Sequence, residues 1–228
     1  MEIKQLNTGP FGVNTWIVPL CGNKVIVFDP AACEFTRDSE KITGFLLNNS
    51  LSPVCIILTH GHFDHITGTR VLKNAFSELP LICHKNDLSM CGASAFEIQG
   101  QALEMMGLSY LAGALKDLPE PDIFFENEVA LSALVKTEDE ELRNALAEWK
   151  VICTPGHTPG SVCWYNKAQK ILISGDTVFY HSWGRTDLPG GSEADIRKSL
   201  SRLYSLIPDE VLVFPGHDYA GFCMGENK

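Results

Sequence analysis

The chain lacks the features that mark exported or membrane-spanning proteins. Its 228 residues contain no apolar run near the ~20 residues that a transmembrane helix needs. No basic region followed by an apolar stretch opens the sequence, so no signal peptide is predicted. The eight Cys form no Cys-x-x-Cys pair. We therefore expect buried free thiols in a reducing compartment, rather than disulfides or a Cys-based metal site, and a cytoplasmic location.

Basic residues are also scarce. Lys and Arg total 18 against 28 Asp and Glu, which gives a formal net charge of -10. Such a surface repels nucleic-acid phosphates and anionic membranes, so we expect neither partner and predict a small-molecule substrate. The 45% apolar and 20% charged residues are typical of a folded globular protein. No repeat or linker divides the chain, which predicts a single domain over residues 1–228. We expect the protein to be a monomer or a homodimer.

Short apolar segments alternate with helical patterns and predict an α/β protein. Strands are predicted at 15–18, 24–28, 54–58, 81–83, 151–153, 162–165, 171–173 and 211–214. Helices are predicted at 36–49, 137–149 and 193–206, with another around 71–76. Residues 86–118 mix Gly, Ser, Ala, Met and Leu, and are expected to form short helices and loops.

The most specific motif follows the predicted strand 54–58. His60-Gly61-His62-Phe63-Asp64-His65 places three His and one Asp within six residues. Imidazole nitrogens and carboxylates are the usual ligands of Zn²⁺ and similar divalent metals. His60 and His62 lie two residues apart in an extended segment and can point toward one ion. Asp64 and His65 continue into a turn and can face a second ion.

Three further motifs follow apolar strands downstream. They are Thr154-Pro155-Gly156-His157-Thr158-Pro159-Gly160-Ser161, Ser174-Gly175-Asp176-Thr177 and Phe214-Pro215-Gly216-His217-Asp218. Each alone is typical of a turn with an incidental polar residue. Together they repeat one pattern, in which a strand is followed by Gly or Pro and then by a side chain that can bind a metal. Because open α/β sheets place their sites at the carboxyl ends of strands, the pattern predicts one shared metal site.

This order of motifs resembles the metallo-β-lactamase superfamily. The segments 59–65, 154–161 and Gly184-Arg185-Thr186-Asp187-Leu188-Pro189-Gly190-Gly191 are most similar to the glyoxalase II-like hydrolases, the hydroxyacylglutathione hydrolase group. The resemblance implies an α/β (α+β) fold, a four-layer αββα metallo-β-lactamase-like sandwich with a dinuclear metal site at one edge.

The same resemblance implies seven ligands for two divalent metal ions. The first ion would be held by His60, His62 and His157. The second ion would be held by Asp64, His65 and His217, with Asp176 bridging the two. Asp29 would orient a ligand from behind. Zinc is the expected metal, and iron or manganese would also suit these ligands.

The expected reaction is thioester hydrolysis. A metal-bound hydroxide would attack the carbonyl of a hydroxyacylglutathione-like thioester, with Asp64 and Asp176 as the catalytic carboxylates. A thiolate, with an ordinary pKa near 8.5, leaves without needing a general acid. Tyr180, His181 and Arg185 are candidate substrate contacts, although pairing of Arg185 with Asp187 within a tight loop is the favoured reading of that segment.

Other reactions fit the same resemblance. A mononuclear iron persulfide dioxygenase would share the His60, His62 and His157 triad and the bridging Asp, and a lactonase would use all seven ligands. A true β-lactamase is disfavoured by Asp176 and by the missing export signal. Full-length glyoxalase II enzymes carry a C-terminal helical domain that contacts glutathione, and we expect a short form without it. Residues 86–150 are expected to form a lid or extra wall over the cleft.

Overall fold

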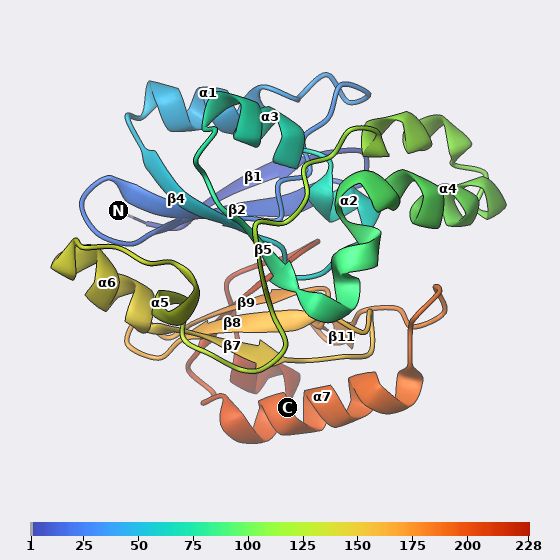
Figure 1. The fold of residues 1–228 in the computed structure, drawn as a ribbon. Helices are drawn as coiled ribbons and strands as arrows, with labels where there is room; N and C mark the ends of the chain where they lie inside the picture. Colours follow the sequence, from blue (N-terminus) through green and yellow to red (C-terminus); the bar gives the residue numbers. More distant parts are fainter. Residues whose placement is uncertain (1) are drawn as a thin grey trace.

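The computed structural model describes residues 2–228, and two β-sheets packed face to face form its centre (Figure 1). The first sheet contains Lys4–Thr8 (β1), Val13–Pro19 (β2), Lys24–Phe28 (β3), Ser52–Ile57 (β4), Leu81–His84 (β5) and Ile123–Phe125 (β6). These strands lie side by side in chain order. β1, β2 and β3 pair antiparallel, whereas β3 to β6 pair parallel, as strands joined by helical crossovers do.

The second sheet has five strands. They are Trp149–Cys153 (β7), Val162–Asn166 (β8), Ile171–Gly175 (β9), Leu212–Pro215 (β12) and Phe222–Cys223 (β13). Their spatial order is β13-β12-β9-β8-β7, and only β12 and β9 pair parallel. β7, β9 and β12 consequently run in one direction, so their carboxyl ends meet at one edge. Val178–Phe179 (β10) and Ser182–Trp183 (β11) form a separate small hairpin.

Helices cover the outer faces of the two sheets, and two short helices pack against the layer between the sheets. They span Lys41–Asn48 (α1), Phe63–Ile66 (α2), Thr69–Ala75 (α3), Ala95–Met105 (α4), Leu131–Leu134 (α5), Glu140–Ala147 (α6) and Glu193–Leu206 (α7). Figure 1 shows α1 and α3 over the first sheet and α7 beneath the second. Short 3₁₀ segments lie at Lys85–Met90 (η1), Gly92–Ser94 (η2), Ser109–Leu115 (η3) and Met224–Asn227 (η4).

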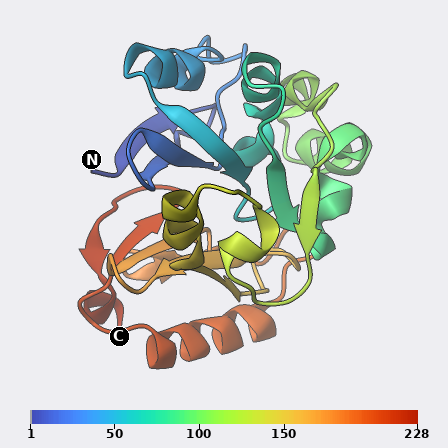
Figure 2. The same cartoon turned by 60° about the vertical axis from the view of Figure 1, so that its left-hand side comes forward.

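Three apolar layers hold this sandwich together. In β3, Val25 and Val27 face the helices, whereas Ile26 and Phe28 face the other sheet, because successive strand residues point to opposite faces. The inter-sheet layer also contains Trp149 and Trp164 of the second sheet, together with residues of α5 and α6. Figure 2 brings those two helices to the front of the sheets. The four-layer αββα architecture is therefore confirmed.

Two predicted helices are shorter than expected. Residues 36–40 form turns, and the helix begins only at Lys41, because Arg37 adopts a left-handed φ of 58°. The Asp38 carboxylate accepts the backbone N–H groups of Gly9 and Cys33, which competes with helix formation. The helix predicted at 137–149 ends at Ala147, since Trp149 already starts β7. Its N-cap is Asp139, whose side chain accepts from Leu142 N–H.

The middle of the chain contains a regular helix and strand that the sequence pattern did not predict. α4 runs for 11 residues within the segment expected to be short helices and loops. Strands β1 and β6, at opposite edges of the first sheet, were also missed, because both are short and partly exposed.

Among the helices of residues 2–228, none is long and apolar enough to cross a bilayer.

The outer apolar layer beneath the second sheet gives a stability prediction. Leu203 of α7 is 0% exposed, whereas Leu206 on the same helix is 50% exposed. Leu203→Ala removes three buried carbon atoms and should lower the free energy of unfolding by about 2–5 kcal/mol. Leu206→Ala makes the same chemical change in solvent and should shift it by less than about 0.5 kcal/mol. Urea denaturation of both variants measures the difference, and equal losses would contradict this packing.

Candidate metal centre

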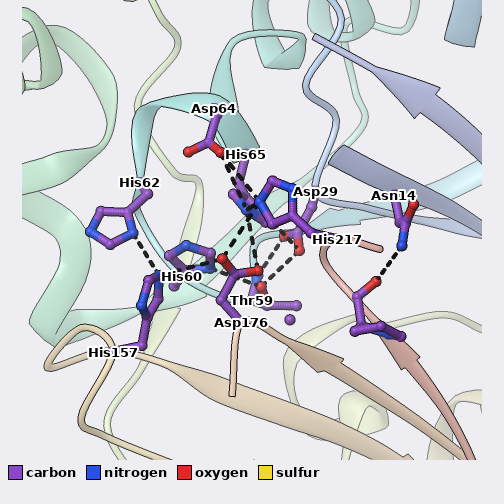
Figure 3. A network of polar contacts seen from close by, with 12 residues as sticks. Asn14, Asp29, Thr59, His60, His62, Asp64, His65, His157, Asp176 and His217 are labelled. Carbon is purple, nitrogen blue, oxygen red and sulfur yellow. Dashed lines mark hydrogen bonds and ion pairs between the residues drawn. The ribbon is translucent and has the colours of Figure 1, made fainter. Parts of the chain in front are cut away.

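Four strand ends bring seven metal-capable side chains to one edge of the sandwich. The ligand motif that starts at His60 follows β4 of the first sheet. His157, Asp176 and His217 follow β7, β9 and β12 of the second sheet. Three groups of these residues each place one ligand atom per residue within 4.8 Å of the others. The sequence motifs therefore meet in space, at the edge where both sheets end (Figure 3).

The first group consists of three buried imidazoles, those of His60, His62 and His157. The Nδ1 atom of His62 lies 2.8 Å from Nε2 of His157, and Figure 3 shows the rings turned toward each other. Burial lowers the pKa of His60 well below its ordinary value and that of His62 to about 3. Both rings are therefore neutral at physiological pH, which is the form that binds a cation.

The second group combines Asp64, His65 and His217. Nε2 of His217 lies 3.2 Å from Nε2 of His65 and 3.4 Å from Oδ2 of Asp64. Burial opposes a charge on His65, but the nearby carboxylates, first Asp176 and then Asp64, outweigh it and raise its pKa to about 10. For His217, burial likewise opposes a charge, and the hydrogen bond to Asp64 raises the pKa overall. The carboxylates make this group a strongly cation-attracting one.

Asp176 lies between the two groups. Its Oδ1 is 3.5 Å from Nε2 of His65, and its Oδ2 is 3.5 Å from Nε2 of His157 and 3.5 Å from Nε2 of His217. One carboxylate therefore faces histidines of both groups. This is the placement that a bridging ligand requires.

Three buried polar atoms of this cluster lack a hydrogen-bond partner among the described residues. They are Nδ1 of His65, which lies beside Asp29, and Nε2 of His60 and Oδ1 of Asp176. An unpaired buried polar atom costs about 1–3 kcal/mol, so native proteins rarely keep one without a function. The His60 and Asp176 atoms point into the ligand cluster, and a cation there would satisfy them. The donor set of imidazoles and carboxylates fits Zn²⁺, Fe or Mn²⁺.

Glycines before two of the ligands leave room for the cluster. A Cβ on Gly216 would lie 2.2 Å from Oδ1 of Asp176 and 2.7 Å from the ring of His65. Gly175 has a left-handed φ of 48°, and a Cβ there would lie 2.3 Å from the Thr59 hydroxyl. The Gly-Asp and Gly-His pairs of the sequence are therefore explained by crowding at the site and, at Gly175, by backbone conformation.

Residues behind the ligands set their orientation. Asp29 accepts hydrogen bonds from the backbone N–H and the hydroxyl of Thr59, both at 2.7 Å. Its Oδ2 also lies 3.1 Å from Nδ1 of His65, at a charge-pairing distance but outside hydrogen-bond alignment. Nδ1 of His157 lies 2.7 Å from the carbonyl oxygen of Arg185, which directs Nε2 toward the other ligands. Such outer contacts fix the tautomer and the direction of a ligating imidazole.

Asp87 is a buttress that the sequence analysis did not identify. It is fully buried after β5, and its carboxylate accepts the N–H of Gly61 at 2.8 Å, the N–H of Gly160 at 2.7 Å and the Thr158 hydroxyl at 2.7 Å. Burial raises its pKa, and these three hydrogen bonds oppose that shift. Asp87 thus joins the loop of His60 and His62 to the loop of His157. An acidic residue at a strand's carboxyl end was the available signal.

Asn14 holds the fourth ligand loop. Its amide nitrogen donates to the carbonyl oxygens of Pro215 and Asp218, both at 3.1 Å, and its backbone N–H donates to Gly216 at 2.7 Å. Asn14 is fully buried in β2, so it connects the first sheet to the loop that carries His217 (Figure 3). An Asn residue beside the apolar run of this strand was the signal that could have predicted this role.

A cavity of about 590 Å³ opens beside the ligand cluster. Arg185, one of the three candidate substrate contacts, lines it and forms two hydrogen bonds of 2.7 and 2.6 Å with Asp187, which is the pairing that the sequence favoured. Tyr180 and His181, the other two candidates, do not line this cavity. The Tyr180 ring packs on His181 and Phe222, whereas Phe179, Ser182 and Trp183 of the same hairpin line the cavity.

The Asp87 contacts predict a specific sensitivity. Asp87→Asn keeps the size of the side chain but turns an N–H group toward backbone donors, so it should lower the free energy of unfolding by about 1–3 kcal/mol. Asp117→Asn, an exposed change of the same type, is the control and should have an effect below about 0.5 kcal/mol. Urea denaturation of the two variants measures the difference. An Asp87→Asn protein as stable as the unchanged protein would contradict this supporting role of Asp87.

Comparison with known proteins identifies relatives that extend over almost the whole chain. The sequence profile of the metallo-beta-lactamase superfamily matches residues 8–217. An uncharacterized protein of Aquifex aeolicus is 32% identical over 95% of this chain and 90% of that protein. The probable metallo-hydrolase YqgX of Bacillus subtilis is 27% identical over 95% and 90%. Glyoxylase B2 of Dictyostelium discoideum is 28% identical over 81% of this chain and 56% of that protein, which agrees with the glyoxalase II-like resemblance.

Solved structures share the fold. The BLEG-1 B3 metallo-beta-lactamase superposes with a TM-score of 0.79 at 26% identity, covering 99% of this chain and 95% of that chain. TTHA1623, solved in a di-iron-bound form, superposes with a TM-score of 0.73 at 29% identity, covering 98% and 96%. The ligand cluster lies at the edge of an αββα sandwich, the fold that these structures share. Together with the profile match and the 32% identical relative, it shows that the chain belongs to the metallo-beta-lactamase superfamily.

Proposed function

We propose that this protein is a dinuclear metal-dependent hydrolase that cleaves acyl thioesters of the acylglutathione type. The observation that carries the proposal is the placement of Asp176, whose two carboxylate oxygens face histidines of both ligand groups. A site for one ion would need only one of these groups. The likeness to Glyoxylase B2 and to a probable metallo-hydrolase supports hydrolysis as the type of reaction.

The first ion would be held by His60, His62 and His157, and the second by Asp64, His65 and His217, with Asp176 shared. When bound, divalent ions lower the pKa of water and polarise a carbonyl oxygen. Zinc suits the three-imidazole group, and TTHA1623 in its di-iron-bound form supports iron as the other candidate.

The protein's own groups would orient the reactants. Asp64 lines the cavity, and its Oδ2 can accept a hydrogen bond from the attacking water while it pairs with His217. The apolar part of the wall, which includes Phe63 and Trp183, lowers the local polarity and strengthens the interactions of the carboxylates with charge. The departing thiolate has an ordinary pKa near 8.5, so it leaves without a protonated side chain beside it.

The test combines metal analysis with a substrate panel on one preparation. We expect about two metal ions per chain and hydrolysis of S-lactoylglutathione and simple acyl thioesters, with little turnover of a β-lactam. A preparation with full metal content that cleaves no thioester would refute the proposal. One iron per chain with oxygen consumption on glutathione persulfide would instead identify a dioxygenase.

Replacement of the shared carboxylate gives a second test. Asp176→Asn should lower kcat/KM for thioesters by at least about 100-fold, which exceeds the usual effect of changing a residue that only orients a metal ligand. It should also reduce bound metal to one ion or none. The exposed Asp117→Asn variant should keep both activity and metal. Kinetics and elemental analysis of the same samples provide the measurement. Full activity with two ions in Asp176→Asn would exclude a bridging role.

A further inference from the structure

The cavity beside the ligand cluster has walls of two different kinds. At one end, Asp64, Asp176 and the ligand histidines face it. Away from them, its wall is built largely from apolar side chains of α4, of the β10–β11 hairpin and of the loop that follows it. Ile98 and Ala102 of α4, four residues apart, lie on one helix face, Trp183 belongs to β11, and Leu188 belongs to the following loop.

The apolar wall is held rigidly against the metal loop. Gln99 of α4 accepts the N–H of Phe63 at 2.8 Å and donates to the carbonyl oxygens of Gly61 at 2.9 Å and Met90 at 2.7 Å. Its oxygen and nitrogen are thus engaged with backbone groups and present little free hydrogen-bonding capacity to a ligand. α4 therefore offers an apolar surface at a fixed distance from the ligands.

Several of these apolar side chains are exposed in the free protein. Ile98 is 47% exposed, Met106 is 37% exposed and Trp183 is 42% exposed. A ligand that covers them removes apolar surface from water, which favours binding. A cavity of about 590 Å³ is also within the range of sites that enclose small molecules.

The charges of the wall do not match glutathione, which carries two carboxylates. Arg185 is the one Lys or Arg side chain among the described residues that line the cavity. Its guanidinium is already paired in a two-pronged contact with Asp187. Arg197, which packs over the Trp183 ring, is paired with Glu193 at 2.6 Å. Asp218 adds a carboxylate to the wall and would repel an anionic tail.

We infer that this cavity binds the apolar acyl chain of a thioester, and that the acyl chain, rather than a glutathione moiety, supplies most of the recognition. The inference rests on the proposed thioesterase function for the chemistry at the carbonyl, but the binding site itself is defined by α4 and the facing loop. The carbonyl lies at the ligand cluster, the chain extends along Ile98 and Ala102, and the thiol half points toward solvent.

Thioesters of N-acetylcysteamine with acyl chains of two to ten carbons test this inference. The value of kcat/KM should rise by about fourfold for each added methylene, the factor that corresponds to about 0.8 kcal/mol per buried CH₂, until the cavity is filled. Acyl chains of equal length on glutathione and on N-acetylcysteamine should give values within about threefold. A flat dependence on chain length, or a preference above about tenfold for glutathione, would overturn the inference.

Two variants locate the chain on α4. Ala102→Phe fills the cavity and should lower the ratio of kcat/KM for the decanoyl thioester to that for the acetyl thioester at least about tenfold. Gln101→Phe adds the same ring on the exposed side of the helix and is the matched control, which should keep this ratio. Ile98→Gln, at a half-exposed position that tolerates polarity, should lower the same ratio. Equal losses for both chain lengths in Ala102→Phe and Ile98→Gln would contradict the proposed path.

A binding measurement separates this inference from the proposed hydrolysis. S-decyl-N-acetylcysteamine is an uncleavable thioether, and calorimetry should detect its binding to the metal-loaded protein and a loss of at least about tenfold in affinity in Ala102→Phe. Binding without hydrolysis of any thioester would support the cavity and refute the thioesterase. Hydrolysis of short thioesters without binding of the decyl probe would support the thioesterase and refute the acyl-chain site.

Discussion

The gathering of five imidazoles and two carboxylates, most of them buried, at a single edge is the constraint on which the rest of this structure depends. Polar groups removed from water cost free energy unless they are paired or bind a cation. The fold meets that cost with contacts behind the ligands. Asp29 supports His65, the carbonyl oxygen of Arg185 supports His157, and Asp87 fastens the two loops that carry the first ligand group. Two atoms, on His60 and Asp176, are left for a metal.

The same constraint explains why two sheets are needed. One strand end of the first sheet and three parallel strand ends of the second sheet supply the seven side chains. The inter-sheet apolar layer, with Phe28 packed near Trp149, sets how the sheets face each other. Asn14 then ties the first sheet to the loop of His217 across the edge. Errors in sheet packing would therefore be transmitted directly to the distances between ligands.

The regions that sequence patterns predicted well are those governed by local rules. β3 and β4 are continuous apolar runs, and the ligand motif that follows β4 is compact, so both could be read from neighbouring residues. α4 was missed because its residues 95–105 include Gly100 and lack a clear apolar stripe, and its helix depends on contacts such as those of Gln99. Tyr180 follows Asp176 closely in the chain, yet its ring packs on Phe222 while its hairpin neighbours Phe179 and Ser182 line the cavity.

The sequence by itself determined the types of the ligands, their order in the chain and the family. Metal binding requires particular side chains, and the ligands downstream each follow a strand and a Gly residue, so both signals can be read from neighbouring residues. The tertiary structure brings together the two ligand groups, with Asp176 between them, that the resemblance implied, and it alone decided that Asp87 and Asn14 support them. It also decided that an apolar cavity adjoins the cluster. These properties arise from contacts between residues far apart in the chain, and their distances depend on how the two sheets and α4 pack.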